Sequence, residues 1–220
     1  MDSAGSEILK AALLFVGALF PIVNPLGNVP IFLSLTRGYS SELRAVLARQ
    51  IAFNGFMLLI VSILIGAHIL AFFGISLPVV QVGGGMVVIA TGWSLLQFKE
   101  DPSKANSGEI SCEDAVKQAF YPLTLPLTVG PGSISVAITL GANAPHQTYL
   151  PVNLIGSALL GPAMIGVSIY LSYRFAERLA KLIGDTAMSV IIRLSSFILV
   201  CIGVQIMWNG VSALLATQRH

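Results

Sequence analysis

Long apolar runs separated by short polar stretches organise the whole chain. Each of the six longest runs contains no Asp, Glu, Lys or Arg and exceeds the roughly 20 residues that a helix needs to cross a bilayer. These runs cover residues 11–36, 50–73, 74–98, 118–144, 147–173 and 194–217. The pattern predicts an all-α integral membrane protein with six transmembrane helices.

Two of these runs are interrupted by helix-breaking residues at similar relative positions. The first run contains Asn24-Pro25-Leu26-Gly27-Asn28, and the fourth contains Gly130-Pro131-Gly132-Ser133. Irregular backbone persists at membrane depth only where protein or a polar cavity satisfies its peptide groups. Matched breaks in two halves of a membrane chain indicate the substrate site of a transporter. We therefore predict that helices 1 and 4 are broken.

The alternative is that Pro25 and Pro131 only kink two tilted helices, with neighbouring side chains satisfying the freed carbonyl groups. Length argues against a simple kink. An unbroken helix over residues 8–36 would be about 43 Å long at 1.5 Å per residue, against roughly 30 Å of hydrocarbon. Such a helix would need a large tilt.

The two broken segments also align with each other. Residues 20–28 match residues 125–133 with Pro21 on Pro126, Gly27 on Gly132 and Asn28 on Ser133, and residues 88–94 lie over 199–205. The alignment predicts a three-span repeat at 1–98, a linker at 99–114 and a second repeat at 115–220. Because three spans is an odd number, the second repeat must be inverted, which would place a substrate site between the repeats. Coincidence is the competing interpretation, since Gly and Pro are common in membrane helices.

Basic residues predict the orientation of these spans. Nine of them fall in the loops at 37–49, 99–117 and 174–181, whereas the opposite side has two, with Arg193 left aside near a helix end. The positive-inside rule places the three loops in the cytoplasm. Both termini should then lie outside, which means the periplasm for a bacterial inner membrane.

The residues at the breaks favour a small zwitterionic ligand. Asn24 is a good N-cap and Pro25 a good first helical residue, so we expect a half-helix to begin at Pro25, and likewise at Pro131 after Gly130. Each helix start presents unpaired amides and a partial positive charge, which suit a carboxylate. The predicted substrate-binding residues are Asn24, Pro25, Gly27, Asn28, Thr128, Gly130, Pro131, Gly132 and Ser133.

Other polar residues within the apolar pattern are candidates for gating or structural roles. Arg193 adjoins the sixth run, and Gln81 occupies nearly the same place in the first repeat. Arg193 either snorkels to the interface or lies inside the protein, where it would pair with helix carbonyls or a substrate anion. Gln205, in the outer part of the sixth run, is of the kind that more often joins helices than binds cargo.

Composition excludes several classes of function. A net charge of +2 with only 10% charged residues, and no basic face interleaved with aromatics, disfavours nucleic acid as a partner. No nucleophile with a base and no intramembrane carboxylate pair is present, so we expect no enzyme. Cys112 and Cys201 lack metal-ligand spacing, and no cofactor is predicted. The expected partners are a small-molecule substrate and the lipid bilayer, and a homo-oligomer remains open.

Taken together, these residues resemble the MarC family of six-span inner-membrane proteins, within a broader grouping of lysine-exporter-like transporters. Segments 21–27 and 126–132, and Arg193-Leu194 followed by 200–205, carry the resemblance, which extends over essentially the whole chain. The family takes its name from a multiple-antibiotic-resistance locus, but membership does not establish drug efflux. Archaeal relatives are described as carriers of small neutral amino acids.

The leading hypothesis is therefore a secondary transporter of small neutral amino acids or similar small zwitterions that works by alternating access. Efflux of drugs or amphiphiles is one alternative. A non-transporting membrane scaffold or envelope-stress protein is the other.

Overall fold

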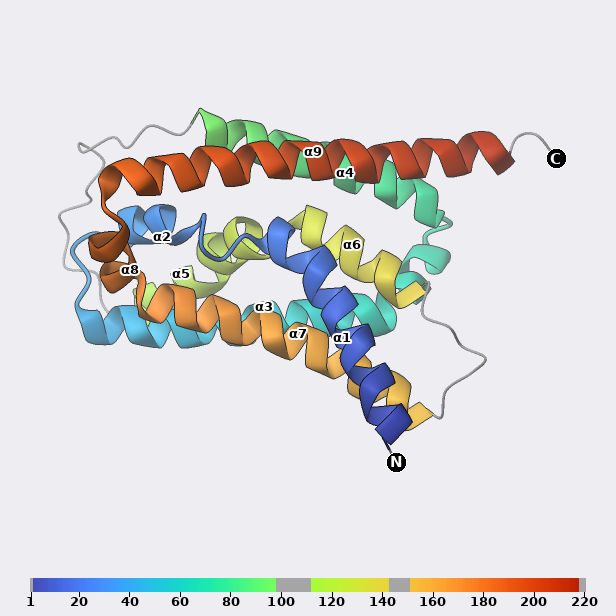
Figure 1. The fold of residues 1–220 in the computed structure, drawn as a ribbon, viewed down its shortest axis with the longest axis horizontal. Helices are drawn as coiled ribbons and strands as arrows, with labels where there is room; N and C mark the ends of the chain where they lie inside the picture. The colour runs from blue at the N-terminus through green and yellow to red at the C-terminus, as the bar shows by residue number, and fades with distance from the viewer. Residues whose placement is uncertain (1, 98–111, 143–150, 218–220) are drawn as a thin grey trace.

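The computed structural model describes residues 2–97, 112–142 and 151–217, and all secondary structure in these ranges is helical (Figure 1). In chain order the elements are α1 (Asp2–Val23), α2 (Val29–Leu35), α3 (Ser41–Phe72), α4 (Leu77–Leu96), α5 (Cys112–Gln118), η2 (Ala119–Thr128), α6 (Pro131–Ala142), α7 (Pro151–Arg174), α8 (Ala176–Ile183) and α9 (Asp185–Thr217). Most of the predicted linker at 99–114 lies outside the described residues, and its last three residues begin α5.

The apolar helices are those of an integral membrane protein. Within the described ranges, α3, α4 and α9 are each long and apolar enough to cross a bilayer. Two bent pairs raise the number of candidate spans to five: η2 with α6, and α7 with α8. The apolar part of α1, Ala12–Val23, is shorter. The predicted count of six spans therefore stays a prediction.

The helices form three layers (Figure 1). α4 and α9 lie side by side in one outer layer, and α3 and α7 form the other. α2, η2 and α6 lie between them, and α6 contacts both α3 and α4. α1 starts beside these segments and crosses over α7, so that the amino terminus lies beyond α7. The irregular stretches of backbone are thus enclosed by regular helices, which is the arrangement that a membrane requires.

Glycines allow the outer pair of helices to pack closely. A methyl group added at Gly85 would lie 2.7 Å from the carbonyl oxygen of Gly203, and one at Gly92 would lie 2.9 Å from that of Ser196. Small residues let membrane helices approach backbone to backbone. Because residue numbers rise along α4 as they fall along α9, the two helices run antiparallel.

The amino-terminal half of α6 packs tightly against α4. A methyl group on Gly132 would overlap the side chain of Val88, and one on Gly84 would overlap that of Ser135. The Ser135 hydroxyl also donates a hydrogen bond to the carbonyl oxygen of Val80, 3.2 Å away. These contacts fix the start of α6, and therefore the second break, at a defined depth in the molecule.

Candidate functional site: two broken segments in contact

The first break begins where Asn24 ends α1. Its amide donates to the Phe20 carbonyl at 2.9 Å as in a helix, but its own φ of 46° lies in the left-handed region. Asn tolerates this conformation because its short polar side chain can bond locally. Here Oδ1 of Asn24 accepts a hydrogen bond from the amide of Gly27 at 3.2 Å. The Asn24 side chain covers Gly27 so closely that a Cβ at this position would overlap it.

The prediction that a half-helix begins at Pro25 is wrong. α2 begins four residues later, at Val29, with Asn28 before it and Pro30 in its first turn. The reason is that Asn24 acts at the end of α1 instead of the start of α2. Helices commonly end in a left-handed Gly or Asn, and proline commonly follows because it cannot continue the helix.

At the second break, the prediction that a half-helix begins at Pro131 is confirmed. η2 ends at Thr128, α6 begins at Pro131, and the two segments meet at a bend of 70°. The carbonyl oxygen of Gly130 accepts from the amide of Ile134 at 3.1 Å and from the hydroxyl of Ser133 at 2.9 Å. The preceding amides of Gly132 and Ser133 fall in the first turn of α6, where no intrahelical acceptor exists.

The irregular backbone of η2 follows from its two prolines. Tyr121 and Leu125 have extended backbone, and each directly precedes a proline. A proline ring disfavours helical conformation in the residue before it. The fourth apolar run is thus irregular over a longer stretch than the Gly130-Pro131 break alone predicts.

Asn28 joins the two breaks. Its Nδ2 atom donates to the carbonyl oxygen of Val23 at 3.0 Å and to that of Leu127 at 3.2 Å. Both donors of one buried amide are therefore used, one in each broken segment, and the two segments lie 99 residues apart in sequence. The two broken segments, which align with each other in the sequence, are therefore in direct contact.

Tyr173 on α7 contacts the second break and α2, the helix that follows the first break. Its hydroxyl lies 2.8 Å from Oγ1 of Thr128, whose single proton is already donated to the Leu123 carbonyl at 2.7 Å. The Tyr173 hydroxyl is therefore the donor to Thr128. Its ring stacks on that of Phe32 in α2, with centroids 4.5 Å apart and planes within 2°. Tyr173 is 1% exposed.

The nine predicted substrate-binding residues thus gather in one region, and most are enclosed. Their exposure is low for seven, intermediate for Gly130 and high for Pro131. Among the described residues, no buried side-chain nitrogen or oxygen lacks a hydrogen-bond partner. In this conformation the polar side chains of the site bond to the protein itself. A ligand would have to replace some of these bonds, and its binding by these residues stays a prediction.

Sequence reasoning did not identify Tyr173, Phe32 or Asn54 as part of this region. Nδ2 of Asn54 on α3 lies 3.5 Å from the hydroxyl of Thr124, which donates to Ala119 at 2.6 Å. In the sequence, Tyr173 precedes Arg174 at the end of an apolar run, which is typical of an aromatic side chain at the membrane interface. No sequence signal distinguishes it from such a residue.

The three candidates for gating lie on the paired outer helices α4 and α9. Gln81 on α4 is partly buried, whereas Arg193 and Gln205 are exposed on α9. Nε2 of Gln205 donates to Oδ1 of Asn209 one turn later, at 2.9 Å. The exposed position of Arg193 fits the snorkelling alternative and not the internal one. A gating role for these three residues stays a prediction.

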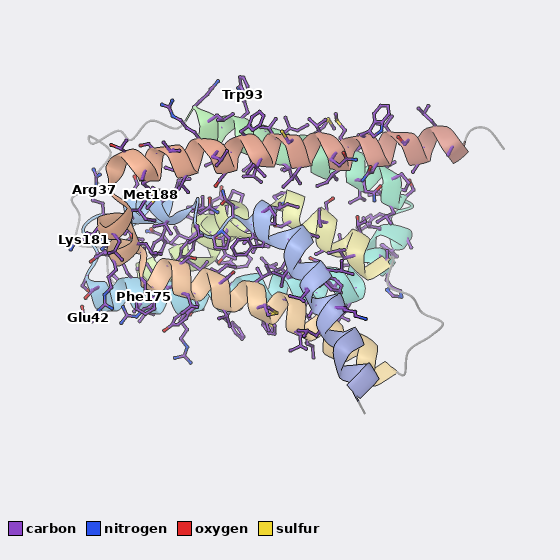
Figure 2. The ribbon with its side chains drawn as sticks, in the orientation of Figure 1. Arg37, Glu42, Trp93, Phe175, Lys181 and Met188 are labelled. Atoms are coloured by element: carbon purple, nitrogen blue, oxygen red, sulfur yellow. The ribbon has the colours of Figure 1, made fainter. Side chains whose placement is uncertain are left out.

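A cavity of about 290 Å³ opens at the end of the molecule formed by α8 and the start of α3, which we call the basic cleft. Its lining residues are Ser41, Arg44, Tyr173, Arg174, Phe175, Ala176, Glu177 and Arg178. Figure 2 shows the same end, where Arg37, Glu42, Phe175 and Lys181 gather. Tyr173 lines the basic cleft and also bonds Thr128 in the second break.

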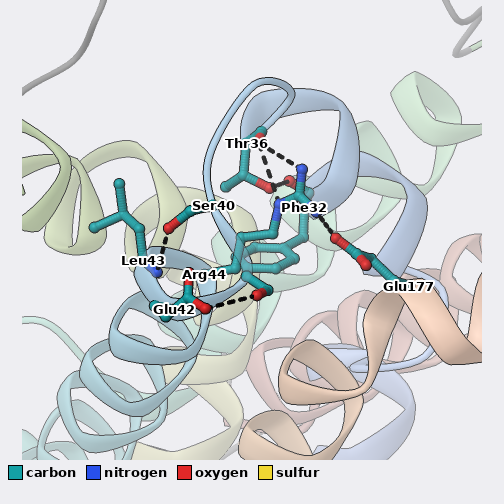
Figure 3. A network of polar contacts seen from close by, with 8 residues as sticks. Phe32, Thr36, Ser40, Glu42, Leu43, Arg44 and Glu177 are labelled. Atoms are coloured by element: carbon teal, nitrogen blue, oxygen red, sulfur yellow. Dashed lines mark hydrogen bonds and ion pairs between the residues drawn. The ribbon is translucent and has the colours of Figure 1, made fainter.

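Arg44 lines the basic cleft and forms a network of polar contacts with residues of two other helices (Figure 3). Its Nε and Nη2 atoms donate to the Thr36 carbonyl at 3.2 and 3.1 Å, and Nη1 forms an ion pair with Glu177. The guanidinium therefore bonds α2 and α8 to the start of α3. Its position at the carboxyl end of α2 is favourable for a positive charge.

Within the described residues, no cluster of three His, Cys, Asp or Glu side chains could hold a metal ion. The buried side chains of Asn24, Asn28, Thr124, Thr128 and Tyr173 offer neutral hydrogen-bonding groups.

Comparison with known proteins gives a consistent result over the whole chain. The model of the MarC family of integral membrane proteins matches residues 9–215. The chain is 32% identical over 218 residues to the inner membrane protein MarC of Citrobacter koseri, covering 96% of this chain and 98% of the relative. It is 30% identical to the proteins of the same name from Salmonella typhimurium and Escherichia coli O1:K1, with the same coverage. No solved structure matches.

Proposed function

Because this chain belongs to the MarC family of integral membrane proteins, we propose that it is a secondary transporter of small neutral amino acids or similar small zwitterions. It is a multi-pass integral protein of the inner membrane. The observation that carries the proposal is the contact between the two breaks, made by Asn28 with the carbonyl oxygens of Val23 and Leu127. Paired discontinuous helices are the usual form of a transporter's substrate site.

The proposed architecture is two inverted repeats of three spans, and the packing of equivalent elements supports it. The first repeat consists of broken α1/α2, α3 and α4, and the second of broken η2/α6, α7 and α9. α3 packs on α7, α4 packs on α9, and the two broken elements meet at Asn28. A pseudo-twofold axis in the membrane plane would bring these equivalent elements together. The antiparallel course of α4 and α9 also fits the inversion.

The chemistry of the breaks favours a zwitterion. In the proposed binding mode, the amides of Gly132 and Ser133 at the start of α6 receive the substrate carboxylate, which the helix dipole also favours. The carbonyl oxygen of Leu127, once released by Asn28, accepts from the substrate ammonium group. A side chain larger than that of a small amino acid would meet the close packing around Gly132 and Val88. Alternating access then follows from rocking of one repeat against the other.

Flux measurements with the purified protein in liposomes test this proposal. We expect the protein to exchange labelled glycine or alanine, and Thr128→Val to reduce the exchange strongly, because it removes the hydroxyl that bonds Tyr173 and Leu123 without changing the shape of the side chain. Thr139→Val is the matched control. Thr139 lies on α6 and bonds only the Ser135 carbonyl one turn earlier, so its loss should leave the flux unchanged.

The result would also decide between the alternatives. Equal flux in the two threonine variants would exclude the assigned site. Absence of amino-acid flux together with export of amphiphilic dyes would favour drug efflux, and absence of both would favour the scaffold. A screen of thermal stability against amino acids adds an independent measure of binding, since a ligand that binds only the folded protein raises its stability.

A further inference from the structure

We propose that Tyr173 closes the substrate site on the side of the basic cleft, and that substrate passes between site and cleft when this ring moves. The Arg44–Glu177 ion pair would hold the closed arrangement. The inference rests on the proposed function, because it names an access route to the same site. It concerns residues that neither the sequence pattern nor the family comparison singles out.

The position of Tyr173 is the first argument. The residue lines the basic cleft, and its hydroxyl bonds Thr128 in the second break. Its ring also stacks on Phe32 in α2, the helix that follows the first break. Tyr173 is 1% exposed, so its side chain is enclosed between the residues of the cleft and those of the breaks. In the proposed route, truncation of this one side chain opens the site to the cleft.

The contacts of Tyr173 couple its position to both broken segments. Phe32, which stacks on the ring, belongs to α2, and Thr128 is the last residue of η2. If α2 or η2 moves relative to α7, as rocking of the repeats requires, the stack or the hydrogen bond must break. Closure by Tyr173 would therefore respond to the motion that transports the substrate.

The Arg44–Glu177 ion pair connects the helices next to the stacked rings of Phe32 and Tyr173. α2 carries Phe32, and its end is bonded to Arg44 through the carbonyl oxygen of Thr36. Glu177 lies on α8, which follows α7 and Tyr173 after a bend of 68°. The Glu177 side chain is 47% exposed and that of Arg44 is 17% exposed, and an ion pair with one partner open to solvent contributes little net stability. Such a pair can open and close reversibly.

The charge of the cleft fits the proposed substrate. Its lining contains Arg44, Arg174 and Arg178 but Glu177 as the only acidic side chain among the lining residues. A cleft of one sign raises the local concentration of ligands of the opposite sign. The carboxylate of a zwitterion would therefore be attracted to the mouth, next to the ring that closes the site.

Accessibility of a cysteine behind Tyr173 tests the proposal without any transported substrate. Cys112 and Cys201 are first replaced by serine, and Thr128→Cys then places a thiol directly behind the ring. A small, zwitterionic, membrane-impermeant thiosulfonate of zero net charge is applied to each face of oriented membrane vesicles. Lys181→Cys, in a separate protein, identifies the face on which the basic cleft opens, because Lys181 is exposed on α8.

We expect slow labelling of Thr128→Cys from both faces in the otherwise unchanged protein. Tyr173→Ala should raise labelling from the basic face toward the rate of the exposed Lys181→Cys, with no change from the other face. Glu177→Gln should raise the labelling rate from the basic face by about two- to fivefold. This factor is expected if the ion pair stabilises the closed arrangement by the small amount that is typical of a solvent-accessible pair. Glu42→Gln, a neutralised acid that is also exposed at the start of α3, should leave the rate unchanged.

Labelling that stays slow in Tyr173→Ala, or that rises equally from both faces, would overturn the proposal, and so would rapid labelling of the parent Thr128→Cys from the basic face. If Tyr173→Ala does not fold, the labelling rates in Glu177→Gln and Glu42→Gln are compared instead, because both substitutions lie at the surface. A higher rate in Glu177→Gln supports the proposal, and equal rates overturn it. The outcome is independent of the proposed function. If the liposomes show no amino-acid flux, the proposed function fails but the labelling rates still test the access route. If the labelling rates do not change in the variants, the access route past Tyr173 fails and the proposed function is untouched.

Discussion

At the residue scale, Asn24 has two separate roles in the first break. Its left-handed backbone ends α1, and its side-chain oxygen binds the amide of Gly27. An N-cap and a left-handed helix terminator are both positions that favour asparagine, and both are commonly followed by proline. The sequence Asn24-Pro25 therefore predicts a helix boundary at this position, but it does not distinguish the end of one helix from the start of the next.

Substitutions of Asn24 separate these two roles. Asn24→Ala loses the side-chain acceptor and also places an ordinary residue in the left-handed region, where the backbone conformation costs about 1–2 kcal/mol. Asn24→Gly loses only the acceptor, because glycine adopts positive φ freely. We expect the melting temperature in detergent to fall in the order wild type, Asn24→Gly, Asn24→Ala. Asn209→Ala, on the exposed face of α9, is the control and should melt as wild type. Equal stability of the alanine and glycine variants would contradict the assigned backbone strain.

At the element scale, the sequence predicts where helices break better than which elements meet. Pro131 starts α6 as expected, because glycine followed by proline leaves few other structures. The extended residues Tyr121 and Leu125 also follow from simple proline chemistry. Tyr173 could not be found in this way, since its role depends on Phe32 and Thr128 being placed next to it by tertiary packing.

The three consecutive glycines of α4 give a prediction about helix packing. A Cβ at Gly83 meets nothing within 4 Å, one at Gly84 would lie 2.1 Å from Oγ and 2.4 Å from Cβ of Ser135, and one at Gly85 would lie 2.7 Å from the backbone of Gly203 and Met207. Gly84→Ala and Gly85→Ala should therefore each destabilise the protein by about 1–3 kcal/mol, which is typical of overpacking.

Gly83→Ala is the internal control for this series. Alanine is a better helix former than glycine by about 1 kcal/mol, so this variant should be as stable as wild type or slightly more stable. Thermal unfolding of the three purified variants in one detergent measures the order. If Gly83→Ala were the least stable of the three, the described packing of α4 between α6 and α9 would be wrong.

At the scale of the whole molecule, orientation joins the sequence and the structure. Sequence alone predicts the basic loops on the cytoplasmic side, and the structure brings the basic residues Arg37 and Lys181 to one end of the helices (Figure 2). The inverted repeat further requires α4 and α9 to cross in opposite directions, which their antiparallel packing allows. Neither observation by itself establishes which end faces the cytoplasm.

Cysteine labelling in oriented vesicles tests orientation and inversion together. Ser76 at the start of α4 and Ser212 near the end of α9 are both exposed and should react from the periplasmic face. Gln97 at the end of α4 and Lys181 on α8 are exposed at the other end and should react from the cytoplasmic face. The native cysteines are replaced by serine, and four proteins are made, each with one cysteine at one of these positions. An impermeant maleimide is then applied to right-side-out and to inverted vesicles.

The pairs make the test specific. If both pairs exchange faces, the topology is correct and the positive-inside orientation is wrong. If Ser76→Cys and Ser212→Cys react from different faces, α4 and α9 do not cross in opposite directions, and the inverted repeat fails. Because three spans per repeat is the reason that the second repeat must be inverted, that result would also remove the axis that relates the two breaks. The proposed substrate site would then lose its architectural support even though Asn28 still joins the two segments.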